Sequence, residues 1–288
     1  MKSNPTSLND TITAIKKFFV NKGFSEVKTP QVITSPFPEP HIDAVEVDGG
    51  YFRTSPELHM KILLAEGQQK IFEVGPCRRK HESGRIHREE FTMLEWYEVG
   101  ADYNDLIGFT RELLLYVCRE TIGSNKVMYN GSLFDFSDPP EIFTLNELFS
   151  NFANVSPEEA LANFQFEELL TDKIEPQLPL DKAVIVKDYP AELAAFSKLK
   201  ENDKSIAERW ELYLGGVEIA NTYTELTDPE EHLSRFAKFA KQRQEAGTPE
   251  YLVDPLFLKA LELGIPDSAG CALGVDRLHM VLNSLDSI

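Results

Sequence analysis

Residues 71–99, IFEVGPCRRKHESGRIHREEFTMLEWYEV, decide the fold, because they read as two antiparallel strands joined by one polar loop. In the second strand two sets of side chains alternate, and this period of two predicts a half-buried β-strand. One face carries Met93 and Tyr97 with Glu95 between them. A buried carboxylate needs a compensating partner, so this stretch indicates a polar site within the sheet.

The composition is that of a globular protein, with 42% hydrophobic and 26% charged residues in a chain of 288. No apolar run approaches the length of a membrane span, and residues 1–19 lack the apolar centre of a signal peptide. Cys77, Cys118 and Cys271 are widely spaced and match no metal or disulfide pattern. We therefore expect a cytoplasmic protein with no membrane partner.

The net charge of −18, from 47 acidic and 29 basic residues, bears on the class of partner. Proteins that grip a nucleic-acid backbone normally present a basic surface, because neutralising phosphates supplies most of the affinity. This balance argues against RNA or DNA, tRNA included, as the main partner. A local basic patch is still compatible with it, since net charge does not describe the distribution of charge.

The rest of the chain predicts an α+β protein in a single domain, residues 1–288, with antiparallel strands and helices packed around them. Residues 125–205 contain helical signals interrupted by prolines, and we interpret them as a mainly helical insertion. The expected helices span residues 8–23, 54–67, 103–118, 229–246 and 254–263, with a last one from about residue 274.

Residues 210–221, WELYLGGVEIAN, predict a hairpin around a two-residue Gly-Gly turn. Such a turn pairs Tyr213 with Glu218 and Glu211 with Ala220, which makes the two carboxylates diagonal neighbours on one face. Oxygen ligands of this kind suit Mg²⁺, especially where phosphates complete the shell. The alternative is that both acids simply face water.

The loop between the first two strands concentrates positive charge in an acidic chain. Such a cluster suits a polyphosphate or a carboxylate, with arginine giving bidentate contacts, although a solvated hairpin tip is the alternative. The basic residues are Arg78, Arg79, Lys80, His81, Arg85, His87 and Arg88.

Residues 270–282, GCALGVDRLHMVL, combine a strand of small residues with the start of a helix. Small residues let a ligand approach the backbone, and Arg277 could lie over a planar group through a cation–π contact. Close packing of a strand against a helix would explain the same pattern.

The chain resembles the catalytic core of class II aminoacyl-tRNA synthetases, in the lysyl branch, because three segments look like the three ordered motifs of that class. GFSEVKTP, ending at Pro30, looks like the first motif, which lies at a dimer interface; residues 77–97 look like the second, and 270–278 like the third. The resemblance runs from about residue 8 to the C-terminus and weakens across 125–205. It implies an antiparallel sheet flanked by helices, a homodimer, and ATP with Mg²⁺ as cofactors.

The resemblance also implies roles at the ATP site. Arg79 matches the arginine that bridges the substrate carboxylate and the α-phosphate, and Arg277 matches the catalytic arginine that stacks on adenine opposite Phe91. The remaining implied contacts are Arg85 and His87 to the outer phosphates, and Glu211 and Glu218 to magnesium.

For the amino acid, the resemblance implies a substrate with two ammonium groups. Glu57 would receive the amine near the carboxylate, and a set of polar residues would hold the rest. The set is Glu95, Tyr97 and Glu225 for the side-chain ammonium, with Asn221 and Tyr223 completing the pocket. Simple alternation puts Asn221 and Glu225 on the opposite face from Glu218, so a bulge near Asn221 is required.

Within this branch the closest resemblance is to the stand-alone paralogues that ligate (R)-β-lysine to a lysine side chain of elongation factor P. The residues before the first motif leave no room for an anticodon-binding domain, which agrees with the acidic balance. Ala272 stands where lysyl-tRNA synthetases usually have glycine, and its methyl group would favour an amine displaced to the β carbon. The implied substrates are lysine or (R)-β-lysine, and the implied partner is elongation factor P.

Departures from the pattern leave two alternatives. The second motif has His81 where a glutamate is usual, with Glu82 next, and Thr222 replaces a small residue. An amino-acid-activating paralogue with another acceptor, such as a tRNA, a carrier or a small molecule, is one alternative. A non-catalytic pseudo-synthetase is the other, although Arg79, Arg277 and the carboxylates are all retained.

Overall fold

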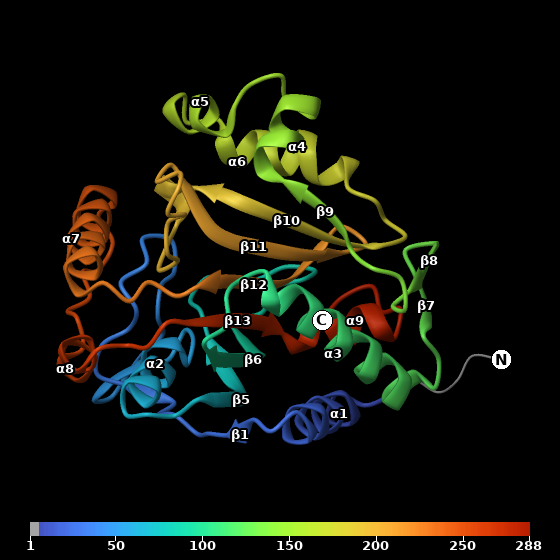
Figure 1. The fold of residues 1–288 in the computed structure, drawn as a ribbon, viewed down its shortest axis with the longest axis horizontal. Helices are drawn as coiled ribbons and strands as arrows, with labels where there is room; N and C mark the ends of the chain where they lie inside the picture. Colours follow the sequence, from blue (N-terminus) through green and yellow to red (C-terminus); the bar gives the residue numbers. More distant parts are fainter. Residues whose placement is uncertain (1–5) are drawn as a thin grey trace.

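A mixed sheet of eight strands runs through the centre of the molecule in the computed structural model, which describes residues 6–288 (Figure 1). The strand order is β1-β5-β6-β13-β12-β11-β10-β9. β1 is parallel to β5 and β9 to β10, and the other neighbours are antiparallel. The bounds are β1 Ser25–Glu26, β5 Lys70–Arg78, β6 Glu90–Val99, β9 Glu141–Thr144, β10 Ala183–Pro190, β11 Ile206–Leu214, β12 Val217–Thr224 and β13 Ser268–Gly274. The predicted α+β class with a mainly antiparallel sheet is confirmed.

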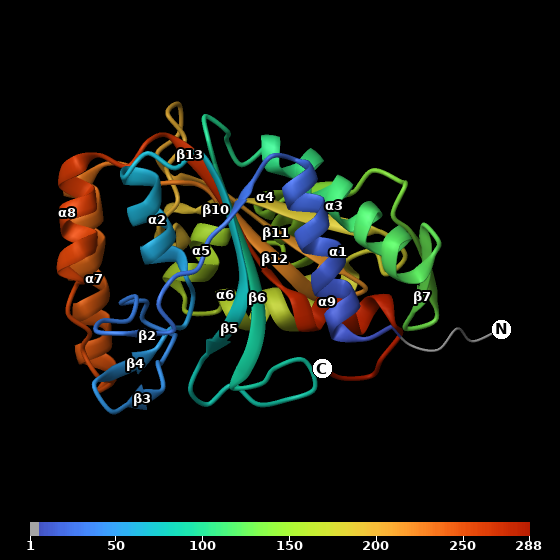
Figure 2. The same ribbon diagram turned by 90° about the horizontal axis from the view of Figure 1, so that it is seen from below.

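One face of the sheet is covered by α1 (Leu8–Asn21), α3 (Asp105–Ile122) and α9 (Val275–Leu282), which lie side by side in Figure 2. Phe19 of α1 stacks on Phe72 of β5 with ring centroids 4.8 Å apart. Leu94 and Trp96 of β6 are 0% exposed beneath these helices. Burying these side chains is the main driving force for this layer.

The centre of β6 is buried on both faces, and the expectation of a half-buried strand is wrong there. Glu95 and Tyr97 are each 2% exposed, although they point away from α1 and α3. The second face is therefore enclosed by other parts of the chain, and its polar residues need partners within the protein.

A second group of helices lies at one end of the sheet (Figures 1 and 2). It comprises α2 (Glu57–Ala65), α7 (Pro229–Ala246) and α8 (Pro255–Leu263). The bounds of α7 match the prediction, because Asp228 caps its first turn and Gly247, with a φ of 70°, ends it. A small sheet of β2 (Val32–Ile33), β4 (Gly50–Phe52) and β3 (Glu46–Val47) lies close by.

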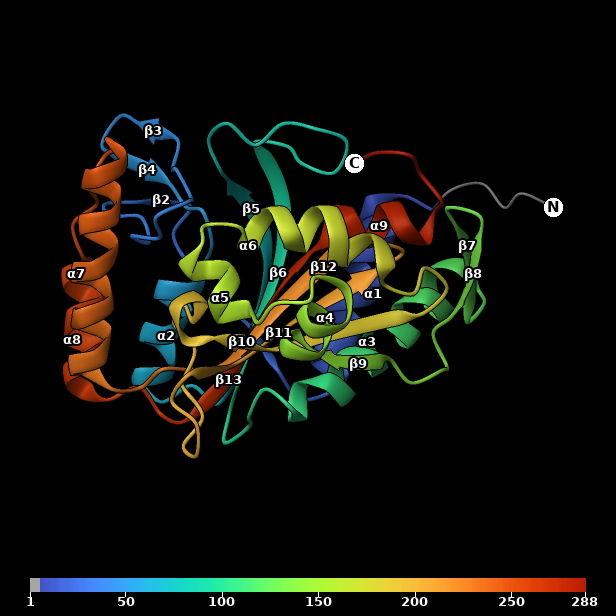
Figure 3. The same cartoon turned by 90° about the horizontal axis from the view of Figure 1, so that it is seen from above.

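Residues 125–205 are helical only in their middle, and the expectation of a mainly helical insertion is wrong for the rest. β9 and β10 belong to the central sheet, and β7 (Lys126–Tyr129) forms a hairpin with β8 (Ser132–Asp135). The helical part lies above β10 (Figure 3) and packs on the Val184 and Val186 side chains. Its elements are α4 Leu145–Phe152, α5 Pro157–Ala162, α6 Phe166–Leu169, a π-helical turn Leu170–Ile174 and 3₁₀ turns Glu175–Gln177 and Ala191–Leu193.

The hairpin of β11 and β12 contains the bulge that the implied site required. Tyr213 pairs with Glu218 as predicted, but the register then shifts and Glu211 pairs with Asn221. The predicted pairing of Glu211 with Ala220 is wrong, because Ile219 is an extra residue on β12. The shift turns Asn221 toward the same face as Glu211, as one inserted residue does in a strand.

Within residues 6–288, no helix is long and apolar enough to cross a membrane.

Candidate active site

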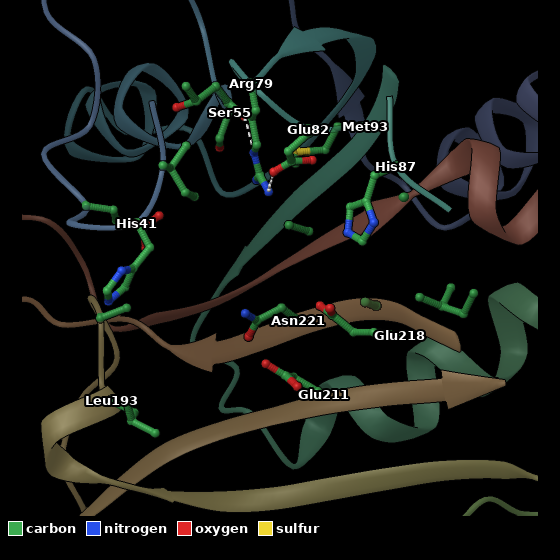
Figure 4. A pocket seen from close by; sticks show the side chains of 18 of the residues that line it. His41, Ser55, Arg79, Glu82, His87, Met93, Leu193, Glu211, Glu218 and Asn221 are labelled. Atoms are coloured by element: carbon green, nitrogen blue, oxygen red, sulfur yellow. Dashed lines mark hydrogen bonds and ion pairs between the residues drawn. The ribbon is translucent and has the colours of Figure 1, made fainter. Parts of the chain in front are cut away.

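A cavity of about 570 Å³ opens on the face of the sheet that α1 and α3 leave uncovered (Figure 4). Its floor is formed by β6, β11, β12 and β13. Its walls come from residues 37–42, from the loop after β5, from the turn Leu170–Ile174 and from the turn Ala191–Leu193. Segments far apart in the sequence therefore meet at one site.

The register of the sheet aligns two rows of residues, most of them polar, across adjacent strands. Residues in register lie side by side on one face of the sheet. The observed register therefore brings several of the predicted site residues together. The first row is Glu211, Asn221, Ala272 and Glu95, and the second is Arg209, Tyr223, Gly270 and Tyr97.

Arg79 and Phe91 form one wall at the basic end of the cavity. The Arg79 guanidinium carbon lies 5.2 Å from the Phe91 ring centroid, and Arg79 Nε donates to the Thr54 carbonyl at 3.3 Å. These two side chains line the cavity together. The arrangement offers an aromatic face and a guanidinium to one planar, anionic ligand.

Arg277 lies at the same end and is fixed by three acceptors from two segments, β12 and the loop between β5 and β6. Its guanidinium contacts the carbonyl of Glu218 at 2.8 Å, the carbonyl of Ile86 at 3.1 Å and His87 Nε2 at 2.7 Å. Burial lowers the pKa of His87, and the nearby Arg277 charge lowers it further. A neutral His87 is the form that accepts a hydrogen bond from Arg277.

The loop between β5 and β6 explains the unusual second motif. His81 has a φ of 68° and is exposed, whereas Glu82 lines the cavity and lies 3.6 Å from Arg79. A left-handed residue at 81 thus brings a carboxylate to the cavity one position later (Figure 4). Arg85 is exposed and donates to the Asp286 carbonyl at 3.1 Å, while Arg88 lines the cavity. The position of Arg85 does not support the predicted phosphate contact.

Glu211 and Glu218 lie near each other and point into the cavity (Figure 4). Burial, followed by the charge of Glu211, raises the pKa of Glu218 to about 7. Glu211 is held by Arg209 at 2.6 Å and by the hydroxyls of Tyr189 at 2.7 Å and Tyr213 at 2.8 Å. The charge of Glu211 raises the pKa of Glu218 because two nearby carboxylates repel each other. A cation between them would relieve this repulsion, and Mg²⁺ prefers oxygen ligands of this kind.

Two acids alone do not make a closed metal site. Within residues 6–288 no group of three or more histidine, cysteine, aspartate or glutamate residues is placed to hold a metal. Mg²⁺ keeps several waters and is often bound through one or two carboxylates plus substrate phosphates. The pair of Glu211 and Glu218 fits that mode of binding, and it does not fit a permanent structural metal.

Next to the cavity, a buried lysine of α2 joins two of the predicted amine-binding acids. Lys61 Nζ lies 2.6 Å from Glu57 Oε1 and 2.6 Å from Glu225 Oε2, and the Lys61 side chain is 0% exposed. Burial alone would lower the pKa of Lys61, but the charges of Glu225 and Glu57 outweigh it and raise the pKa above its ordinary value. Lys61 is therefore an ammonium held between two carboxylates.

The buried carboxylate of Glu95 has the partners that its position requires, because two hydroxyl groups donate to it. Tyr97 donates to Oε1 at 2.5 Å and Ser55 donates to Oε2 at 2.8 Å. Burial, followed by the charge of Glu57, nevertheless raises the pKa of Glu95 to about 8. Burial likewise raises the pKa of Glu225 to about 7, against the effect of Lys61. We expect both acids to lose their protons when a cationic ligand binds beside them, because a nearby positive charge lowers the pKa of a carboxyl group.

Most of the predicted residues meet at this site, in two depths. Three of them, Glu95, Tyr97 and Glu225, are at most 2% exposed and are buried next to the cavity, without lining it. Those lining the cavity itself are Glu57, Arg79, His87, Phe91, Glu211, Glu218, Asn221, Tyr223, Ala272 and Arg277.

Sequence reasoning missed Lys61 and Arg209. Lys61 follows Glu57 by four residues, the spacing of an ordinary surface ion pair on a helix. Arg209 lies two residues before Glu211, on the same face of a strand. Its guanidinium contacts Glu211, the Asn221 side chain at 3.2 Å and the Leu193 carbonyl at 2.7 Å. Basic residues at these spacings from predicted acids were the available signal.

The sequence matches the family model described as tRNA synthetases class II (D, K and N) over residues 2–288. The chain belongs to this family. The "Elongation factor P–(R)-β-lysine ligase" of Proteus mirabilis (strain HI4320) is 34% identical over 293 residues, covering 96% of this chain and 90% of the relative. That of Vibrio atlanticus (strain LGP32) is 33% identical, covering 97% and 91%.

The family also contains longer relatives. The "Lysine–tRNA ligase" of Clostridium perfringens (strain SM101 / Type A) is 32% identical over 307 residues, covering 96% of this chain and 61% of the relative. This chain therefore spans less than two thirds of that protein's length. Class II tRNA synthetases are ligases that generally use ATP and Mg²⁺, and this chain is a ligase of that class.

Proposed function

We propose that this chain activates lysine or (R)-β-lysine with ATP as an aminoacyl-adenylate and transfers it to a lysine side chain of elongation factor P. The observation that carries the proposal is that one cavity has residues of opposite charge at its two ends. Arginines line one end, and carboxylates line the other end or are buried next to it. Similarity to the elongation factor P–(R)-β-lysine ligases along most of both chains supports the same reaction.

In the first step the substrate carboxylate attacks the α-phosphate of ATP, and pyrophosphate leaves. Arg79 would hold the carboxylate against the α-phosphate, and Phe91 with Arg277 would enclose the adenine. Holding the reactants in line removes much of the entropic barrier, and the two guanidiniums offset the charge that grows in the transition state. Glu211 and Glu218 would hold Mg²⁺, which neutralises phosphate charge.

In the second step the acceptor amine attacks the carbonyl carbon of the adenylate, and AMP leaves as the amide bond forms. The cavity mouth bears on which acceptor enters. Glu167 and Glu192 line it and are exposed. Their charge attracts a lysine side chain and repels the phosphates of a tRNA end. A protein lysine is therefore the acceptor that this surface favours.

A homodimer remains part of the proposal through the first motif. The segment around it exposes Val20 and Val32, which are 59% and 47% exposed. Burial of such exposed apolar side chains would favour association of two copies. Light scattering of the purified chain would detect a dimer, and a monomer at micromolar concentration would contradict this part of the proposal.

The test supplies ATP and Mg²⁺ with α-lysine or (R)-β-lysine, and either elongation factor P or bulk tRNA. We expect elongation factor P to gain the mass of one lysyl unit, with more product from (R)-β-lysine. Charging of tRNA alone would replace the proposal with lysyl-tRNA synthesis, and no pyrophosphate release with either amino acid would contradict activation. The Arg79→Met variant should abolish pyrophosphate release. Arg78→Met is the matched control, because Arg78 lies over the Phe52 ring at 4.3 Å and does not line the cavity.

A further inference from the structure

Residues 37–43, which we call the Glu39 loop, cross one side of the cavity and are fixed from two directions. Phe37 is 7% exposed and packs on Phe196, with ring centroids 4.0 Å apart. At the other end, the backbone N–H of Lys80 donates to the Asp43 carbonyl at 2.7 Å. The loop thus joins the helical end of the molecule to the strand–loop–strand that carries Arg79.

Arg243 of α7 holds the middle of this loop. Its guanidinium donates to the carbonyls of Glu39 at 2.8 Å and Ile42 at 3.1 Å, and to Asp43 Oδ1 at 2.5 Å. The Arg243 side chain is 0% exposed and lies over Tyr251 at 4.3 Å. A buried guanidinium is stable only when its donors are satisfied, so Arg243 fixes the path of the backbone at Glu39.

The loop presents Glu39 to the cavity on the side of the predicted amine site. Glu39 lines the cavity and is half-buried. Burial and then the charge of Glu57 raise the pKa of Glu39 above its ordinary value. The pKa of Tyr223 is raised first by burial, then by Glu57 and Glu39. Glu57 and Tyr223 line the same cavity as Glu39, so the two carboxylates and the phenol border one space.

The other acids of the cavity are engaged or solvated. Glu57 is paired with Lys61, and Glu82 and Glu218 each have an arginine partner, at 3.6 and 3.5 Å. Glu211 has Arg209, and Glu167 and Glu192 are exposed to water. Among residues 6–288, the Glu39 side chain makes no ion pair or hydrogen bond. A half-buried carboxylate without a partner in the protein is available to bind a cationic ligand.

We infer that Glu39 is a specificity-determining residue that binds the ammonium group nearest the substrate carboxylate. The inference rests on the proposed function and assigns one charge that Glu57 does not supply alone. Glu57 shares its charge with Lys61, so a second substrate ammonium needs a further carboxylate. Glu39 provides it from the Glu39 loop, which lines the same cavity as Ala272.

The test compares ligands that differ only in that amine, by calorimetry on the intact protein. (R)-β-lysine and α-lysine carry an amine beside the carboxylate, and 6-aminohexanoate lacks it. We expect Glu39→Gln to weaken binding of both lysines about tenfold or more, in line with the loss of one charge-assisted contact. Binding of 6-aminohexanoate should stay within about twofold. Glu39→Asp, which keeps the charge with a shorter reach, should retain part of the affinity for the lysines.

Controls separate this inference from the proposal beneath it. Glu46→Gln, on the neighbouring strand β3 and exposed, should leave the affinity for all three ligands unchanged, and thermal melts should show that each variant is folded. Equal weakening of all three ligands by Glu39→Gln, or weakening of none, would overturn the inference while the wild-type affinities uphold lysine recognition. Wild-type protein that binds neither lysine would overturn both.

Discussion

The ammonium group of Lys61 lies 2.6 Å from Glu225 Oε2, and neither side chain is exposed to solvent. An ion pair in this position stabilises the fold little by itself, because removing both charges from water offsets their attraction. Removing one partner is different, since it leaves an uncompensated charge in a nonpolar surrounding. Lys61 therefore holds together a group of acids that the fold would otherwise not tolerate at neutral pH.

Replacing Lys61 with methionine should lower the free energy of unfolding by about 3–5 kcal/mol at pH 8. Methionine has a similar length, so the change removes the charge with little change in packing. At pH 5.5 the loss should be smaller, because burial raises the pKa of Glu225 to about 7 and this acid then takes up a proton at lower cost. Urea denaturation at the two pH values measures both effects.

Lys16→Met is the matched control for this prediction. Lys16 pairs with Glu26 at 2.6 Å on the surface, with side chains 38% and 34% exposed. Surface pairs of this kind contribute about 0–1 kcal/mol. A loss for Lys61→Met no larger than for Lys16→Met, or the same loss at both pH values, would contradict the role of Lys61.

Affinity for the amino acid should rise with pH between 6 and 8. In the ligand-free protein burial raises the pKa of Glu95 to about 8 and of Glu225 to about 7. Below these values both acids hold protons, and an incoming ammonium must displace them. Each proton released on binding steepens the dependence by about tenfold per pH unit, and the curve should level off above pH 8.

Calorimetry of (R)-β-lysine binding in buffers of different ionisation enthalpy measures that proton release. Glu95→Gln should weaken binding and flatten the dependence on pH, since a neutral amide has no proton to lose. An affinity that stays constant from pH 6 to 8 in the wild-type protein would show that these acids are already ionised.

Site residues could be predicted from sequence where a short local pattern placed them on one face. They could not be predicted where the pairing register between two strands determined which residues meet. The alternation through Glu95 and Tyr97 gave their shared face directly. The hairpin gave Tyr213 opposite Glu218, but Ile219 shifts the next pair, so that Glu211 meets Asn221. A bulge of one residue leaves no mark on the hydrophobic pattern, and only the requirement of a common face pointed to it.

Elements and side chains whose environment is set by tertiary contacts were the least predictable. β10, Ala183–Pro190, pairs with β11 and is buried under the helices that precede it. A buried apolar run of this length does not distinguish a strand from a helix, so the segment was assigned to a helical insertion. Lys61 was missed for a related reason, because its second partner, Glu225, is 164 residues away along the chain.

Gly270 should tolerate no side chain, because β13 passes between two groups of the amine pocket. A Cβ at this position would lie 2.3 Å from a Tyr97 ring carbon and 2.5 Å from Glu225 Oε1. Both neighbours are buried and fixed by partners. Gly270→Ala should lower the free energy of unfolding by about 1–3 kcal/mol and should raise the KM for the amino acid without changing the KM for ATP.

Gly108→Ala serves as the control, since Gly108 is inside α3 with no heavy atom within 4 Å of an added Cβ. Alanine there should stabilise the protein by about 0.5–1 kcal/mol through helix propensity. Pyrophosphate exchange and thermal unfolding of both variants test the pair. Unchanged amino acid affinity in Gly270→Ala would place the side-chain ammonium elsewhere.

Glu82, and not His81, should affect ATP binding. Glu82 lies 3.6 Å from Arg79 at the cavity, and His81 is exposed with a φ of 68°. Glu82→Gln removes an anionic partner of the Arg79 guanidinium, which would then be less well oriented, so the KM for ATP should rise about three- to tenfold. His81→Gly keeps a residue that adopts a positive φ without strain, and its KM for ATP should stay within about twofold of wild type. A larger effect at His81 than at Glu82 would show that the loop rearranges when ATP binds, with the histidine turned toward the nucleotide.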